Sequence, residues 1–270
     1  MRTPALALAA TAAALLFLST ASPAQAITDG ALDGEGHPNV GIMVAYIDGE
    51  PQWRCSGTLI SSTLYLTAGH CTYGADDVEI WFQSDLEADD DLYGYPEIDM
   101  GQVGGTPFVH PEYDDAAFYL HDLGMVVLDE PVIVDEYGAL PTVNQLDAYA
   151  KSTKKDAWFT AVGYGLQKSF PDAASWKDQA LRTRMVATPK LTQINGGLAG
   201  DYSLLLSNNT HTGGTCSGDS GGPNFIGDSN VIAGATSYGL NSACGGTGGV
   251  YRIDRADDLD WIYAEFGAQL

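Results

Sequence analysis

Residues 215–223 read Thr-Cys-Ser-Gly-Asp-Ser-Gly-Gly-Pro, and this stretch decides the fold. Its central serine, Ser220, lies among glycines that have no side chains to shield its hydroxyl. A lone serine beside glycines is usually only a turn residue. Two distant segments favour a different interpretation, because His70 ends the run Leu-Thr-Ala-Gly-His and Asp122 stands just before an apolar run. Together the three residues offer a nucleophile, a general base and a group that orients the base.

The order of these residues excludes two other hydrolase classes. Residues 218–222 also fit G-x-S-x-G, the nucleophile elbow of α/β-hydrolases, in which the catalytic histidine follows the serine in the chain. The last histidine here is His211, which precedes Ser220. The sequence also lacks the H-E-x-x-H motif of a large class of zinc proteases. The remaining order is histidine, aspartate and then serine.

The chain resembles the chymotrypsin-like (trypsin-type) serine peptidases from Ile27 to about Phe266. The specific matches are residues 67–71 (Thr-Ala-Gly-His-Cys) and residues 218–223 (Gly-Asp-Ser-Gly-Gly-Pro). Three weaker landmarks follow the order of the family: Gly-Tyr-Gly at 163–165, Ser-Tyr-Gly at 237–239 and Gly-Val-Tyr at 249–251. The resemblance implies a serine endopeptidase that works through an acyl-enzyme. The alternative is a non-catalytic homologue that uses the same scaffold to bind other proteins.

The resemblance also implies a role for each site residue. This family is the standard example of the triad, so Ser220 is expected to be the nucleophile, His70 the base and Asp122 the residue that orients His70. The backbone N–H groups of Gly218 and Ser220 would form the oxyanion hole. Glycine suits position 218 because a tight loop there requires a backbone angle that other residues resist.

The N-terminus has the pattern of a secretory signal. Residues 1–26 contain one early charge, Arg2, then an apolar stretch, and end in Ala-Gln-Ala, which is typical of a cleavage site. We therefore expect a secreted, extracellular protein in which cleavage exposes Ile27 as the new amino terminus. By resemblance, the ammonium group of Ile27 would pair with Asp219 and shape the oxyanion loop.

Four cysteines suit an oxidising compartment and allow three pairings, among which the sequence alone does not choose. The resemblance implies the disulfides Cys55–Cys71 and Cys216–Cys244. A zinc site is disfavoured because no C-x-x-C pair occurs.

The fold class is expected to be all-β. Short apolar segments alternate with turns, a pattern that is typical of a barrel or sandwich. The clearest are residues 40–47, 56–66, 78–82, 125–128, 158–162, 202–206, 231–235 and 250–253. The resemblance implies two antiparallel six-stranded Greek-key barrels with the active site between them. The expected organisation is a signal at 1–26, a barrel at 27–130, a connector at 131–157, a barrel at 158–253 and a helix at 254–270. We expect the helix to pack on the second barrel.

The resemblance places Gly214 at the base of the specificity pocket, with Ser237, Gly239 and Gly249 also in contact with substrate. Trypsin-type members hold an aspartate at the base, whereas Gly214 carries no charge. We therefore expect a neutral pocket that prefers large apolar or aromatic side chains.

Charge is distributed unevenly along the chain. Residues 27–150 contain one basic residue, Arg54, and 24 acidic ones, whereas residues 151–270 contain ten basic and eleven acidic residues. Nucleic acid is an unlikely partner for such an acidic surface, because like charges repel. An acidic cluster at 85–91 lies where some relatives carry a calcium loop, but it lacks a defined ligand pattern. We expect no cofactor, no metal and no membrane partner after signal removal, and a monomer that acts on protein or peptide substrates.

Overall fold

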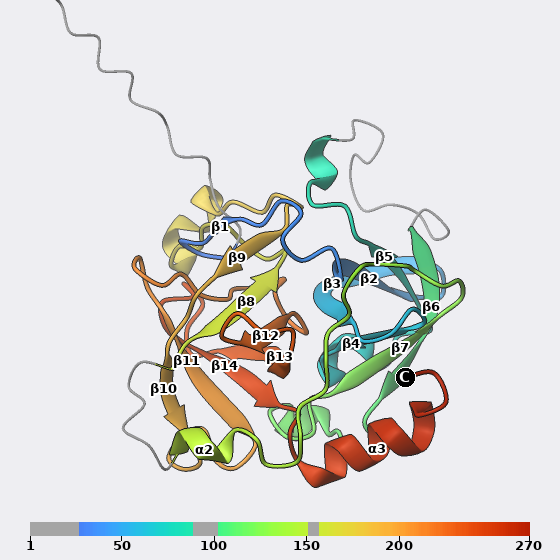
Figure 1. The fold of residues 1–270 in the computed structure, drawn as a ribbon. Helices are drawn as coiled ribbons and strands as arrows, with labels where there is room; N and C mark the ends of the chain where they lie inside the picture. The colour runs from blue at the N-terminus through green and yellow to red at the C-terminus, as the bar shows by residue number, and fades with distance from the viewer. Residues whose placement is uncertain (1–26, 89–101, 151–156) are drawn as a thin grey trace, which may run out of the picture.

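A computed structural model describes residues 27–88, 102–150 and 157–270. The predicted signal at 1–26 and three residues of the acidic cluster, Asp89, Asp90 and Asp91, lie outside these ranges. Two β units lie side by side, and one longer helix crosses beneath them (Figure 1). No helix in the described part of the chain is both long and apolar enough to cross a membrane.

The first unit is a closed antiparallel barrel with the strand order β2-β3-β4-β7-β6-β5. Its elements are β2 (Val40–Ile47), β3 (Glu50–Leu59), β4 (Leu64–Thr67), α1 (Gly69–Thr72), β5 (Asp77–Trp81), η1 (Leu86–Ala88), β6 (Val103–Val109), η2 (Asp115–Ala117) and β7 (Gly124–Leu128). The predicted segment 40–47 is confirmed as β2, whereas the predicted segment 56–66 divides into β3 and β4 at a short turn.

Alternation along β2 explains how this barrel packs on its neighbour. Met43 and Ala45 join a core cluster formed by residues of the first unit. Ile42 and Val44 join a second cluster that also contains Phe225 and other residues of the second unit. Successive side chains of a strand point to opposite faces, so one face of β2 fills the barrel and the other forms the interface.

The second unit is one eight-stranded antiparallel sheet with the order β1-β9-β8-β12-β13-β14-β11-β10. Its elements are β1 (Ala31–Leu32), α2 (Asp147–Ala150), β8 (Phe159–Gly163), η3 (Asp172–Lys177), β9 (Met185–Ala187), β10 (Leu191–Ile194), β11 (Ser203–Asn208), β12 (Pro223–Ile226), β13 (Ile232–Gly239) and β14 (Gly246–Arg252).

This sheet stays open, because the strand that would close it into a barrel is broken. β9 pairs with β8 and β10 pairs with β11, yet only residues 188–190 separate β9 from β10 in the chain. Pro189 lies in the break, and proline cannot donate a ladder hydrogen bond. If β9 and β10 are counted as one bent strand, the unit has the six strands that the sequence predicted, and β1 is an additional edge strand.

The C-terminal helix α3 (Ala256–Phe266) lies within the predicted range 254–270. The hydrogen bonds from Tyr251 of β14 to Asp258 agree with the expected packing on the second unit, and α3 also reaches across to the first barrel below β6 and β7 (Figure 1). Phe266 contacts Phe108 of β6 edge-on at 5.4 Å between ring centroids, and Trp261 contacts His110 in the same way at 5.0 Å. Aromatic pairs at these distances add to the burial of apolar area, so the helix ties the two units together.

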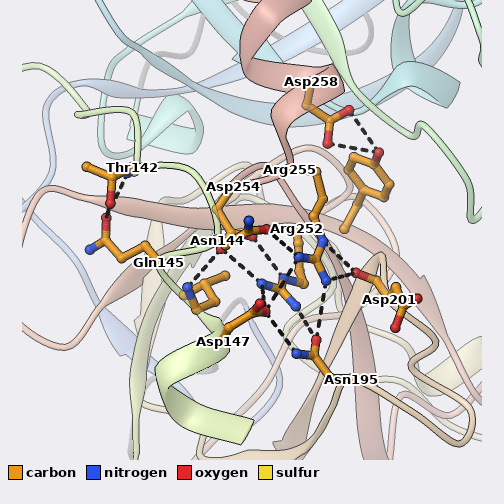
Figure 2. Close-up of polar contacts among 12 residues, drawn as sticks. Thr142, Asn144, Gln145, Asp147, Asn195, Asp201, Arg252, Asp254, Arg255 and Asp258 are labelled. Carbon is orange, nitrogen blue, oxygen red and sulfur yellow. Dashed lines mark hydrogen bonds and ion pairs between the residues drawn. The ribbon is translucent and has the colours of Figure 1, made fainter.

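A buried arginine, Arg252, ends β14 shortly before α3 begins and makes several polar contacts. Arg252 forms ion pairs with Asp254 and with Asp147 of α2, both at 2.9 Å, and it also contacts Asn195 (Figure 2). Arg255 donates two hydrogen bonds to the backbone oxygen of Asp201. These contacts attach α2, which lies within the predicted connector 131–157, to the sheet of the second unit. The domain boundaries themselves remain predictions.

Candidate active site

His70 and Asp122 come from neighbouring parts of the first barrel. His70 lies in α1, directly after β4, and Asp122 lies just before β7, the strand that pairs with β4. Nδ1 of His70 is 3.0 Å from each carboxylate oxygen of Asp122, and the His70 backbone N–H donates to Oδ1 at 2.8 Å. Asp122 is fully buried, so this carboxylate is fixed from two sides and holds the imidazole ring in one orientation.

Ser237 is a third partner of this carboxylate. Its hydroxyl donates to Oδ2 of Asp122 at 2.5 Å. Ser237 belongs to β13, in the second unit, so the hydrogen bond joins the two halves of the protein. The sequence predicted a substrate contact for Ser237. The structure gives its side chain a clear role in supporting Asp122.

The loop that carries Ser220 is held against the segment before His70. The backbone N–H of Gly221 donates to Thr236 O at 2.7 Å, and Gly221 is packed so closely on Thr67 and Ala68 that a side chain would not fit. Ser220 O accepts from the N–H of Ser56 at 2.7 Å. Among the described residues no hydrogen bond joins the Ser220 hydroxyl to His70, so this link of the triad stays a prediction. Catalytic hydrogen bonds often form only when substrate is bound.

The oxyanion loop has the backbone form that the sequence predicted. Gly218 has a φ of +94°, which favours glycine, and its carbonyl accepts from the Ser56 hydroxyl at 3.0 Å. Within the described residues neither the Gly218 N–H nor the Ser220 N–H donates to a protein acceptor. Gly218 and Ser220 are both partly exposed, so these two N–H groups beside the serine can donate to an incoming oxygen.

The pKa of His70 is set by opposing effects. Burial is the largest and lowers it, but the charge and hydrogen bonds of Asp122, with a smaller contribution from Asp115, outweigh burial. The pKa of His70 is therefore raised above its ordinary value. A raised pKa makes the neutral ring a stronger base.

Asp219 stands between Gly218 and Ser220 in the chain and is fully buried. It accepts hydrogen bonds from the N–H groups of Gly165 at 2.7 Å and Cys216 at 2.8 Å. Burial nevertheless raises its pKa to about 7. Such a carboxylate would gain from a cation, and Ile27 is also fully buried, against Ala161 of β8. The structure does not join Ile27 to Asp219, so their pairing remains a prediction.

The two predicted disulfides are present. Cys55–Cys71 links β3 to the residue that follows His70, and Cys216–Cys244 braces the loop before Ser220. The described residues contain no free cysteine.

A pocket of about 340 Å³ opens beside Ser220. Its lining has no acidic or basic side chain and consists of Thr215, Cys216, Ser217, Ser220, Thr236, Ser237, Tyr238, Gly239, Leu240, Asn241, Ser242 and Cys244. Two of the predicted pocket residues, Ser237 and Gly239, are among these. Gly214 instead packs on Asn208, and Gly249 lies against the ring of Tyr238. The roles of Gly214 and Gly249 therefore stay predictions.

Arg54 is a site residue that sequence reasoning missed. A Cβ built on Gly218 would lie 3.4 Å from Nε of Arg54, so the guanidinium group lies beside the oxyanion loop. Its charge also acts on Asp219 to lower the pKa of that carboxyl, against the larger effect of burial. One feature of the sequence could have indicated this residue: Arg54 is the single basic residue in the acidic range 27–150, and it directly precedes Cys55.

The family model described as Trypsin matches residues 35–262. The chain belongs to the trypsin family. The resemblance stated from the sequence is thereby confirmed.

Curated relatives agree with the trypsin family. The chain is 27% identical over 245 residues to Serine protease 7 of Drosophila melanogaster, with 82% of this chain and 60% of that protein covered. It is 29% identical over 225 residues to Trypsin of Saccharopolyspora erythraea, with 80% of this chain and 88% of that protein covered. The chain thus spans less than two thirds of the fly protein.

Solved structures show the same fold at lower identity. HL collagenase matches with a TM-score of 0.68 at 20% identity, covering 89% of this chain and 99% of that one. Human heparin binding protein matches with a TM-score of 0.62 at 18% identity, covering 87% of this chain and 93% of that one. The trypsin-family fold is therefore established for the chain by two independent comparisons.

Proposed function

We propose that this trypsin-family protein is a serine endopeptidase that hydrolyses peptide bonds through Ser220, His70 and Asp122. The observation that carries the proposal is the buried carboxylate of Asp122, which is hydrogen-bonded to the ring of His70 and to Ser237 from the opposite unit. The close packing of Gly221 on Thr67 and Ala68, just before His70, supports Ser220 as the nucleophile of the same site.

The reaction follows from these positions. The Ser220 hydroxyl attacks the peptide carbonyl carbon while Nε2 of His70 takes its proton. The C–N bond then breaks as His70 returns the proton to the leaving amine, which leaves an ester on Ser220. Water hydrolyses this ester with His70 again acting as the base. Asp122 keeps the proton of His70 on Nδ1 and stabilises the imidazolium.

The unpaired N–H groups of Gly218 and Ser220 would receive the negative oxygen of the tetrahedral intermediate. Loss of one such donor typically costs about 10²–10³-fold in turnover. The charge of Arg54, beside Gly218, would favour the same oxyanion.

The neutral pocket supports a preference for large apolar or aromatic side chains before the cleaved bond. The lining offers no carboxylate to pair with arginine or lysine. Hydrolysis of matched chromogenic peptides tests this proposal: phenylalanine and leucine peptides should react faster than arginine peptides, and the reverse order would reject it.

We also propose that the protein is secreted and that removal of the signal activates it. A free ammonium group on Ile27 would keep the buried Asp219 ionised and so fix the oxyanion loop. N-terminal sequencing of the secreted, active protein should begin at Ile27. An active form with a different first residue would exclude this route.

The decisive experiment is labelling with an organophosphate serine reagent. The processed protein should incorporate one equivalent at Ser220, and the variant Ser220→Ala should incorporate none and hydrolyse no peptide. A non-catalytic, protein-binding homologue would show no incorporation in the parent protein. The variant Ser217→Ala, three residues earlier in the same loop, is the matched control and should still be labelled.

A further inference from the structure

We propose that His110, His121 and Asp258 form a binding site for a divalent transition-metal ion of the Zn²⁺ type. The three residues come from different elements: His110 directly follows β6, His121 precedes Asp122, and Asp258 is in α3. One potential ligand atom from each residue lies within 4.8 Å of the others.

Both histidines present unsatisfied nitrogen atoms. Nε2 of His110 and Nδ1 of His121 are buried and have no hydrogen-bond partner in the described part of the chain. The His110 side chain is only 3% exposed. Buried polar atoms are normally paired, and each exception calls for an explanation such as an unoccupied ion site.

The carboxylate of Asp258 completes the set. It is fully buried, and its Oδ1 is 3.8 Å from Nε2 of His110. Its hydrogen bonds come from the Tyr251 hydroxyl, at 2.9 and 3.1 Å, as Figure 2 shows. A carboxylate that is held by a tyrosine and faces two imidazoles resembles a metal ligand with its supporting hydrogen bond.

The two rings are stacked, with centroids 5.0 Å apart and planes that differ by 12°. Imidazole lone pairs lie in the plane of the ring, so a shared ion ~2.0–2.1 Å from each nitrogen requires one of the two rings to turn about its side-chain bonds. Two histidines and one carboxylate also leave a fourth position for water. Hard ions such as Ca²⁺ would need several more oxygen ligands.

Binding would also require a change of tautomer at His110. The N–H of Glu112 now points at Nδ1 of His110 at 3.2 Å, so in the neutral ring the proton is on Nε2. A metal on Nε2 requires that proton to be on Nδ1, and the contact with Glu112 must be released. Trp261 and Tyr202 pack around the two rings and shield them from solvent.

The site would act on the triad, and this part rests on the proposed function. His121 is joined directly to Asp122, so the triad carboxylate is the next residue after a ligand of the proposed site. A divalent cation there would attract the charge of Asp122 and draw His121 toward α3. Both effects would weaken the support that Asp122 gives to His70, so we expect Zn²⁺ to slow turnover several-fold.

The binding test uses the full protein with Ser220→Ala, so that it does not depend on catalysis. Titration calorimetry with Zn²⁺ should give one ion per chain, and Co²⁺ should give the visible absorption of a tetrahedral site. His121→Asn and Asp258→Asn should each weaken binding at least tenfold. Asparagine tolerates the positive φ of His121 (+49°) and can accept from Tyr251 at position 258, so both variants retain the local fold.

Controls separate this site from its neighbours. His211→Asn removes an exposed histidine elsewhere, and Glu112→Gln alters the more exposed group of Glu112, His121 and Asp257; neither should weaken binding. The proposal is overturned if the parent binds no Zn²⁺, if binding survives both ligand variants, or if Glu112→Gln abolishes it. On the active protein, Zn²⁺ that slows the parent and His121→Asn equally would reject the coupling to Asp122. A protein without activity that still binds Zn²⁺ would contradict the proposed function alone.

Discussion

The hydroxyl of Ser237 donates to Oδ2 of Asp122 at 2.5 Å across the interface of the two β units. The orienting carboxylate of the first barrel is therefore partly held by the second.

Replacing Ser237 with alanine should lower kcat. A hydrogen bond to a charged group contributes about 1.5–3 kcal/mol, which corresponds to roughly a ten- to hundredfold loss if Asp122 no longer orients His70. Steady-state kinetics with one peptide substrate measures the effect. Ser242→Ala is the matched control, because Ser242 lines the same pocket without a side-chain contact to Asp122. Equal kcat values for the two variants would refute a supporting role for Ser237.

The acid limb of the pH profile should lie above the ordinary histidine value of 6.5, because Asp122 raises the pKa of His70 and catalysis requires the neutral ring. Asp122→Asn should move the limb of kcat/KM to lower pH. It should also lower kcat about 10⁴-fold, the loss known for the same exchange in the trypsin triad. A limb that does not move would mean that Asp122 leaves the pKa of His70 unchanged.

Stability should depend on pH through Asp219 while Ile27 is still blocked. Burial raises the folded pKa of Asp219 from 3.8 to about 7, so folding takes up a proton and the free energy of unfolding falls as pH rises between these values. After signal removal, the ammonium group should keep Asp219 ionised and flatten this dependence. Denaturant unfolding of both forms at pH 5 and pH 7, with Ser220→Ala to prevent self-digestion, compares the slopes. Identical slopes would argue against the Ile27–Asp219 pair.

Arg54→Gln should lower kcat by roughly three- to tenfold at low salt, since a unit charge several ångströms from the oxyanion loop contributes on the order of 1 kcal/mol. The loss should shrink as ionic strength increases. Lys190→Gln removes the same charge at an exposed position in the break between β9 and β10 and should leave kcat unchanged. If both variants behave alike, the effect reports net charge and not the position of Arg54.

Two neighbouring arginines should differ sharply in their effect on stability. The Arg184 side chain is fully buried and pairs with the buried Asp33 at 2.8 Å. Arg184→Ala removes this ion pair, leaves the Asp33 carboxylate with only its contacts to His37 among the described residues, and should cost about 3–5 kcal/mol of unfolding free energy. The partly exposed Arg182 pairs with Glu87 at 3.0 Å, and Arg182→Ala should cost about 1 kcal/mol or less. Denaturant unfolding measures both, and similar losses would contradict the assigned burial.

The sequence predicted the features that depend on short motifs. The segments around His70 and Ser220 carry their own residue pattern, and with the family resemblance they led to both disulfides and to the barrels. The broken closing strand escaped prediction, because the bend at Pro189 becomes visible only when β9 and β10 are found on different neighbours.

Residues that act only through tertiary contacts could not be assigned their partners from the local sequence. Arg54 lies 164 positions before Gly218 in the chain and meets it only because β3 packs on the Ser220 loop. The helix α3 had the expected apolar spacing, but nothing in that spacing indicates which barrel it covers. Asp258 therefore could not be connected to His110 and His121 from the sequence.

Ser56 belongs to the first barrel, yet its backbone N–H donates a hydrogen bond to Ser220 O. Its hydroxyl group donates to Gly218 O and accepts from the N–H of Tyr164. Neither half can therefore assemble the reactive turn without the other. Two fragments that are divided in the connector and expressed separately would each be inactive, and peptide cleavage would return only when they reassociate. Fused to two other proteins, such fragments would report whether those proteins come close together.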